Sequence, residues 1–162
     1  MTPFAIAGVQ MPVAATHENV SLIAHKVDLV VRQFPWVQMI LFSELAPFGP
    51  LPDNHPDNLQ DTLDQFCEIA RHHGIWLIPG SMFEHEGGHM YNTAHVINPD
   101  GEVVGKHRKM FPFEPYEQGV TGGTEFLVFD VPGAGRFGLT ICYDIWFPET
   151  TRTLTSLGVE VL

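Results

Sequence analysis

The first half of the chain alternates short apolar segments that carry no charge with longer segments whose apolar residues recur at helical spacing. Residues 4–9 predict a strand buried on both faces, because a half-exposed strand would alternate apolar with polar residues, and residues 37–42 and 75–78 predict two further strands. Residues 20–31 and 59–70 predict amphipathic helices between these strands. A β-α-β-α-β order implies a parallel sheet with right-handed crossovers, so we predict an α/β protein.

The second half of the chain predicts antiparallel strand pairs instead of crossovers. The turn sequence NPDG at 98–101 separates two predicted strands, which is typical of a hairpin. A further strand pair, a helix with Pro148 near its first turn and a final strand with an unpaired edge follow. These predicted elements are strands 91–97 and 102–104, strands 126–131 and 137–141, helix 148–157 and strand 158–162.

Length and charge limit the classes of protein to which the chain can belong. The 162 residues, of which 44% are hydrophobic, suit one domain spanning 1–162. The formal net charge of −11 argues against nucleic acid or an anionic membrane as the main partner. No apolar stretch approaches the roughly 20 residues of a membrane-spanning helix, and the N-terminus lacks the basic region of a signal peptide. Since there are only two cysteines, we expect a reducing, cytoplasmic location.

Two segments match cofactor motifs but lie in the wrong context. HEGGH at 85–89 matches the H-E-x-x-H zinc pattern, which requires a helix so that both histidines share one face. This segment contains two glycines and lies between predicted strands, so we interpret it as a hairpin tip. GAGRFG at 133–138 matches the dinucleotide pattern G-x-G-x-x-G, but it enters a strand rather than opening a helix. We interpret it as a tight turn with glycines at positive φ.

Cys142 follows the predicted strand 137–141 and precedes the predicted helix 148–157. Such a turn exposes a side chain at the edge of a sheet and directs backbone N–H groups and a helix dipole toward it, which favours a thiolate and can bind an oxyanion. The alternative is that Cys142 is a small buried hydrophobic residue, as we expect for Cys67 on the apolar stripe of helix 59–70. The residues alone support both interpretations of Cys142 equally.

Two further segments carry groups that could act together with a nucleophile. Glu44 ends the apolar run 39–42, and ligands of parallel sheets bind outside the carboxyl ends of the strands. A carboxylate held there among apolar groups loses hydration, its pKa rises and it can act as a base; alternatively, Glu44 turns back to solvent in a loop. Segment 107–117 mixes basic, acidic and aromatic residues in a long connection. A lysine there could stabilise a negative oxygen, whereas the alternative is a solvated loop with a few ion pairs.

Three motifs occur in the order and at the spacing of a known enzyme family. Glu44 in FSEL, Lys109 in HRKMFPFEPYE and Cys142 in GLTICYDIWFPE resemble the Glu-Lys-Cys triad of the nitrilase superfamily, the carbon–nitrogen hydrolases. The resemblance covers essentially the whole chain. Glu117 would match the second active-site glutamate of aliphatic amidases, and ICYD followed by FPE is similar to the amidase branches. Leu45 departs from the tyrosine that aliphatic amidases carry beside the first glutamate, so the subfamily stays open.

The resemblance implies a hydrolase that cleaves a small amide through a cysteine thioester. Glu44 would accept the thiol proton of Cys142, and Lys109 together with the backbone N–H of Tyr143 would hold the oxyanion. Glu117 would position the substrate amide and the lysine. No metal or organic cofactor would be needed. Two aromatic residues near these in sequence would line the acyl pocket, namely Phe113 and Trp146.

The resemblance also implies a four-layer α-β-β-α sandwich, which is substantially longer than this chain. We therefore expect the chain to be the N-terminal portion of a larger hydrolase, incomplete at the C-terminus, or to have its open strand edge covered by another element; as an isolated monomer it should aggregate. The family associates through the helix after the nucleophile, so we expect a homodimer or larger assembly through 148–157. Alternatives are a nitrilase, an N-carbamoyl amide hydrolase, an acyl transferase, or a binding or assembly module that has lost catalysis.

Overall fold

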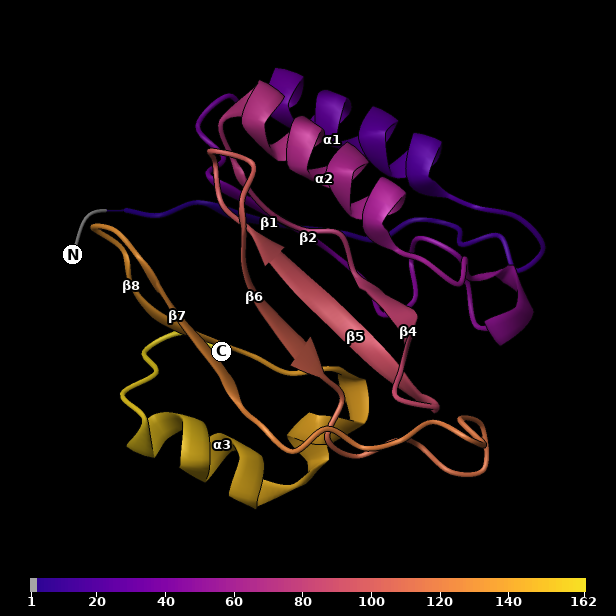
Figure 1. Cartoon of the computed structure of the whole chain (residues 1–162). Coiled ribbons are helices and arrows are strands. Elements are labelled where there is room, and N and C mark those ends of the chain that lie inside the picture. The colour runs from indigo at the N-terminus through magenta and orange to yellow at the C-terminus, as the bar shows by residue number, and fades with distance from the viewer. Residues whose placement is uncertain (1–2) are drawn as a thin grey trace.

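Three parallel strands form the first part of the larger sheet in the computed structural model, which describes residues 3–162. The first elements are β1 Ile6–Val9, α1 Val20–Gln33, β2 Met39–Phe42, the 3₁₀ turn η1 Pro52–Asn54, α2 Gln60–His73 and β3 Trp76–Ile78. β2 pairs in parallel with both β1 and β3, and α1 and α2 lie side by side over one face of the sheet (Figure 1). This arrangement confirms the predicted β-α-β-α-β order.

Burial on both faces explains why β2 and β3 carry no charge. In β2, Ile40 packs with α1 and α2, whereas Met39 packs toward the second sheet. In β3, Leu77 packs with the helices and Trp76 packs toward the second sheet. The prediction of two buried faces is wrong for β1, the edge strand: Ile6 shares the face of Met39 but is 44% exposed, because the second sheet does not cover it.

The larger sheet continues as antiparallel strands. These strands are β4 Ser81–Glu86, β5 His89–Ile97 and β6 Val103–Arg108. β5 pairs with β3, β4 and β6, which completes a six-stranded sheet. The turn between β4 and β5 contains Gly87 and Gly88, both at positive φ. His85 and His89 therefore lie on adjacent antiparallel strands at a hairpin tip, which confirms the interpretation of HEGGH.

β6 is longer than the sequence predicts, because 102–104 covers only its first part and the expected polar loop begins within it. Its two cationic side chains are paired with a carboxylate of β4, the strand on the other side of β5. Lys106 and Arg108 form ion pairs with Glu84 at 2.7 and 2.9 Å. Charged side chains can thus occupy this strand without leaving unpaired charges on a partly buried surface. As a result Lys109 directly follows a strand, which fixes its backbone.

A second, two-stranded sheet faces the first. It consists of β7 Leu127–Val131 and β8 Gly135–Leu139, and it is followed by the 3₁₀ turn η2 Cys142–Trp146 and by α3 Pro148–Ser156. Gly133 and Gly135 adopt positive φ in the turn between the two strands, which confirms the interpretation of GAGRFG. Beyond α3, Val161 forms a single parallel bridge with Phe137, so the predicted final strand is present only as this bridge.

Helices, larger sheet, smaller sheet and α3 form successive layers in the order α-β-β-α (Figure 1), which confirms the predicted fold class. The first core lies between the helices and the larger sheet and includes Ile23 and Phe66, both fully buried. The second core lies between the sheets, where the ring of Trp76 packs on Phe129 at 5.9 Å. Within residues 3–162 no helix is long and apolar enough to cross a bilayer.

Candidate active site

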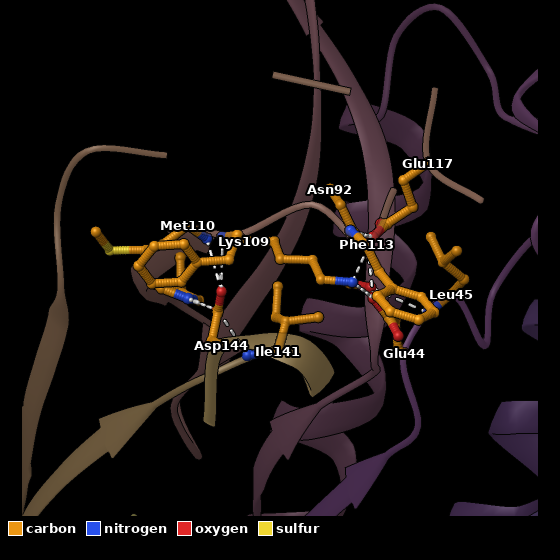
Figure 2. Close-up of polar contacts among 12 residues, drawn as sticks. Glu44, Leu45, Asn92, Lys109, Met110, Phe113, Glu117, Ile141 and Asp144 are labelled. Carbon is orange, nitrogen blue, oxygen red and sulfur yellow. Dashed lines mark hydrogen bonds and ion pairs between the residues drawn. The ribbon is translucent and has the colours of Figure 1, made fainter. Parts of the chain in front are cut away.

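Five polar side chains from separate elements gather near one end of the strands. Glu44 follows β2, Asn92 lies in β5, Lys109 follows β6, Glu117 lies in the next connection and Cys142 follows β8. β6 runs in the same direction as β2, and β5 runs against both, so the end of β6 and the start of β5 lie at the carboxyl edge of the parallel strands. Figure 2 shows four of these side chains pointing toward one another.

The ammonium group of Lys109 is buried between two carboxylates. The side chain is 1% exposed, and Nζ donates to Glu44 Oε1 at 2.7 Å and to Glu117 Oε2 at 2.5 Å. Burial acts to lower the pKa of Lys109, but hydrogen bonds and charge from Glu117 and Glu44 outweigh it and raise the pKa above its usual value. Lys109 therefore stays charged, and an ammonium group has one N–H left after two bonds.

Glu117 is held as a carboxylate by three donors. Its Oε2 accepts from Lys109 and from the backbone N–H of Phe113 at 2.6 Å, and its Oε1 accepts from Asn92 Nδ2 at 2.8 Å. Burial would raise the pKa of Glu117, but these three donors prevail and lower it. An ionised carboxylate with both oxygens engaged is poorly suited to take up a proton. Glu117 is therefore placed to hold Lys109 rather than to act as a base.

Glu44 has one carboxylate oxygen engaged and one available. Its Oε1 accepts from Lys109 and, at 2.8 Å, from Asn92 Nδ2. In the part of the chain that the structure describes, no nitrogen donor contacts Oε2. Glu44 and Cys142 line the same cavity, whose volume is about 90 Å³. This arrangement leaves Oε2 as the oxygen that can accept the thiol proton.

Cys142 is exposed and opens the turn η2 with a φ of 46°, in the left-handed region that L residues rarely adopt. Partial burial, followed by the negative charge of Glu44, raises the pKa of its thiol. The expectation that the turn favours a thiolate is therefore wrong: a single 3₁₀ turn has a small dipole, and the nearby carboxylates oppose ionisation. Cys67 packs against the core from α2 as predicted.

Asn92 was not among the residues that the sequence singles out. It is fully buried in β5, and its Nδ2 contacts both glutamates (Figure 2). Its backbone carbonyl also accepts the N–H of Lys109 at 2.8 Å. Asparagine is disfavoured in strands, so its presence inside the predicted strand 91–97 was the available signal.

Asp144 was also missed, although it joins the two segments that carry Lys109 and Cys142 (Figure 2). The carboxylate is fully buried and accepts four hydrogen bonds. The donors are the backbone N–H groups of Ile141 at 3.0 Å, Met110 at 2.9 Å and Phe111 at 2.9 Å, and His107 Nε2 at 2.9 Å. The turn η2 is therefore attached to the end of β6 through a single side chain.

The aromatic residues predicted to line the acyl pocket form a cluster beside η2. The ring of Tyr143 lies 4.7 Å from Phe113 and 5.6 Å from Trp146. Trp146 is 76% exposed and Phe113 39%. None of these three lines the cavity shared by Glu44 and Cys142. Their contribution to substrate binding stays a prediction.

A larger groove, of about 510 Å³, lies at the opposite end of the strands, beside Gln38, Trp76 and Asp100. It contains none of the convergent polar groups described above, so size alone does not make it the site. Within residues 3–162 no group of three or more histidine, cysteine, aspartate or glutamate side chains is arranged to hold a metal ion. The chemistry available at the carboxyl edge is that of a thiol, an ammonium group and two carboxylates.

Residues 5–162 match the family model for carbon–nitrogen hydrolases. The chain is 29% identical to omega-amidase NIT2 from Bos taurus, covering 100% of this chain and 63% of that protein. It is 30% identical to a formamidase from Bacillus cereus (strain B4264), covering 80% of this chain and 41% of that protein. Among solved structures, an amidase from Nesterenkonia sp. is similar with a TM-score of 0.87 at 26% identity, covering 98% of this chain and 63% of that chain.

The chain thus spans less than two thirds of the length of these relatives. The family model nevertheless extends over almost every residue, and the four-layer fold is shared with an amidase along nearly the whole chain. The protein therefore belongs to the carbon–nitrogen hydrolase family, within the nitrilase superfamily.

Proposed function

We propose that the protein hydrolyses the carbon–nitrogen bond of a small amide to a carboxylic acid and ammonia through a thioester on Cys142. The observation that carries this proposal is the arrangement at Glu44: its Oε1 accepts from Lys109 and Asn92, no nitrogen donor among the described residues contacts its Oε2, and its side chain lines the same cavity as Cys142. A base and a thiol of raised pKa side by side suit attack on a carbonyl group, because the thiol keeps its proton until the base removes it.

In the first step, Glu44 Oε2 takes the proton of the Cys142 thiol while sulfur attacks the amide carbonyl carbon. The carbonyl π electrons move to oxygen, which becomes an oxyanion. The remaining N–H of Lys109 can stabilise this oxygen, since Nζ already uses two hydrogens on the glutamates. The backbone N–H of Tyr143 is the second proposed donor, because it lies in the first turn of η2, where N–H groups lack intrahelical partners.

In the next step the oxyanion re-forms the carbonyl, the carbon–nitrogen bond breaks, and Glu44 gives its proton to the departing amine. Ammonia leaves and the acyl group stays on Cys142 as a thioester. Glu44 then accepts a proton from water, which attacks the thioester carbon, and a second oxyanion forms at the same donors. As this oxyanion collapses, the carbon–sulfur bond breaks, the carboxylic acid leaves, and Glu44 returns its proton to the sulfur of Cys142. Glu117, bound by three donors, holds Lys109 throughout.

Two of the similar proteins support a small amide as the substrate. They are an omega-amidase and a formamidase. The cavity of about 90 Å³ between Glu44 and Cys142 is also small. Residues of the chain supply the base, the nucleophile and the oxyanion donors, so the proposed reaction needs no metal or organic cofactor.

We also propose that the protein assembles as a homodimer or larger oligomer through α3. Three large apolar side chains next to this helix support the proposal: Ile145 is 55% exposed, Trp146 76% and Leu157 47%. Exposed apolar residues that flank one helix are typical of a protein interface. The net charge of −11 disfavours nucleic acid as a partner, and the two free cysteines accord with a reducing, cytoplasmic location.

Ammonia release from a panel of small amides by the full-length protein tests the proposed reaction. Cys142→Ala and Lys109→Ala should each lower kcat at least about 100-fold, as expected for loss of a nucleophile or an oxyanion donor. Cys67→Ala, the matched control, should keep full activity. Full activity in either of the first two variants would refute the assignment.

The products separate the alternatives. A nitrilase would release ammonia from nitriles, and an N-carbamoyl amide hydrolase would release carbon dioxide together with ammonia. An acyl transferase would pass the acyl group to added hydroxylamine. A binding or assembly module would turn over none of these compounds.

A further inference from the structure

We infer that Asn92 is a positioning residue of this site, which orients Glu44 and Glu117 by donating one N–H to each. The inference rests on the proposed function and extends it to a residue that does not touch the reacting atoms. Asn92 is fully buried in the interior of β5. Its Nδ2 lies 2.8 Å from Glu44 Oε1 and 2.8 Å from Glu117 Oε1.

The two carboxylates fix the orientation of the Asn92 amide. An amide nitrogen has two hydrogens, so each carboxylate receives one. Rotation of the amide by half a turn would place Oδ1 against both carboxylate oxygens, where lone pairs would repel each other. In the observed orientation Oδ1 is buried and has no hydrogen-bond partner among the described residues. A buried acceptor without a donor destabilises the fold, so the two charge-assisted bonds from Nδ2 must compensate for it.

The strand also fixes the backbone of Asn92. Asn92 pairs with Phe83 of β4, and its carbonyl accepts the N–H of Lys109. The same residue therefore sets the position of the Lys109 main chain and of both carboxylates that Lys109 contacts. A displacement of Asn92 would move the base, the cation and the second glutamate together.

A neutral donor suits Glu44 better than a second cation would. Lys109 already places one positive charge beside the two carboxylates. A second ammonium group would stabilise the carboxylate charge further and make Glu44 a weaker base. An amide engages Oε1 without adding charge, so Oε2 is the oxygen left for the thiol while the cluster keeps one net negative charge.

Asn92→Ala and Asn92→Asp test the inference in the full-length protein. The alanine variant removes both donors, and the aspartate variant replaces them with a third carboxylate of nearly the same shape. Both should lower kcat about 10- to 100-fold with little change in KM, because Asn92 is fully buried and its amide nitrogen donates to the two carboxylates. The acid limb of the kcat/KM profile should move to higher pH by about one unit, and further for Asn92→Asp, since the coupled carboxylates lose a donor to their ionised form.

Thr93→Val is the matched control. Thr93 is equally buried in the next position of β5, and its hydroxyl donates to Glu84 on the opposite face. This variant loses a buried hydrogen bond in the same strand, so it should lower the melting temperature without moving the acid limb. If the Asn92 variants lose activity but keep the wild-type pH profile, as a merely structural role requires, the inference is wrong.

A titration that does not depend on turnover separates this inference from the proposed reaction. The Glu117 carboxyl should titrate at higher pH in Asn92→Ala than in the wild type when followed by ¹³C NMR, with Glu117→Gln used to assign its signal. An unchanged Glu117 titration would overturn the inference. If the wild-type protein hydrolyses no amide while this titration shifts as expected, the proposed reaction fails and the positioning role stands.

Discussion

Replacing Asp144 should destabilise the protein more than any other single change outside the hydrophobic cores. The fully buried carboxylate accepts the N–H groups of Ile141, Met110 and Phe111 and the Nε2–H of His107. Asp144→Ala leaves all four donors in a space closed to water. Leaving a buried donor unpaired costs about 1–3 kcal/mol, so four such donors would cost at least about 4 kcal/mol, and we expect a loss of about 4 kcal/mol after partial relaxation.

Asp144→Asn should lose about half as much, about 2 kcal/mol, because one oxygen can still accept the N–H groups of Met110 and Phe111 while the new NH₂ group faces Ile141. Urea denaturation of the full-length protein, followed by circular dichroism, measures both losses. Asp130→Ala provides the control, since Asp130 forms an exposed ion pair with Arg136 and its loss should leave the urea midpoint unchanged. A loss below about 1 kcal/mol for Asp144→Ala, or a larger loss for asparagine than for alanine, would refute the reasoning.

Two further predictions concern single residues. Burial lowers the pKa of His95 to about 4, so between about pH 4 and 6.5 the folded protein binds fewer protons than the unfolded chain. The contribution of His95 to the free energy of unfolding should be fully present above about pH 6.5 and fall by about 3 kcal/mol as the pH drops to about 4. The urea midpoints of His95→Gln should lack this part of the pH dependence. Cys142→Gly should be at least as stable in thermal denaturation as Cys142→Ala, because an L residue at the φ of 46° costs about 1–2 kcal/mol; a clearly less stable glycine variant would mean that the turn carries no such strain.

The sequence predicts the order of the elements well because the periodicity of burial is local information. The charge-free segments of β2 and β3 are explained by cores on both faces. β1 has an equally apolar sequence, yet Ile6 is exposed, because coverage of a face depends on how far the opposite sheet extends. The extent of β6 was hidden for a similar reason: Lys106 and Arg108 indicate a loop until their partner Glu84 is placed opposite them.

The site was predictable only where a motif carries it. Glu44, Lys109 and Glu117 come together as expected, and Cys142 lines a cavity with Glu44. Asn92 and Asp144 were missed because their roles depend on contacts with residues 48 and 34 positions away. No local pattern encodes such contacts. A dipole argument uses only the turn itself and so gives the wrong direction for the pKa of the Cys142 thiol, which partial burial and then the negative charge of Glu44 raise.

The proposed catalytic groups are divided between the two sheets. The base, the cation and the asparagine belong to the larger sheet, whereas the thiol follows β8 of the smaller one. Besides the hydrogen bonds of Asp144, their alignment therefore depends on how Trp76, Phe129 and Phe137 pack between the two sheets. Productive geometry tolerates errors of only about 0.5 Å, so one sheet sliding on the other by less than an atomic radius would disable a correctly folded molecule. The hydrophobic layer between the sheets thus helps to hold the proposed catalytic groups in register.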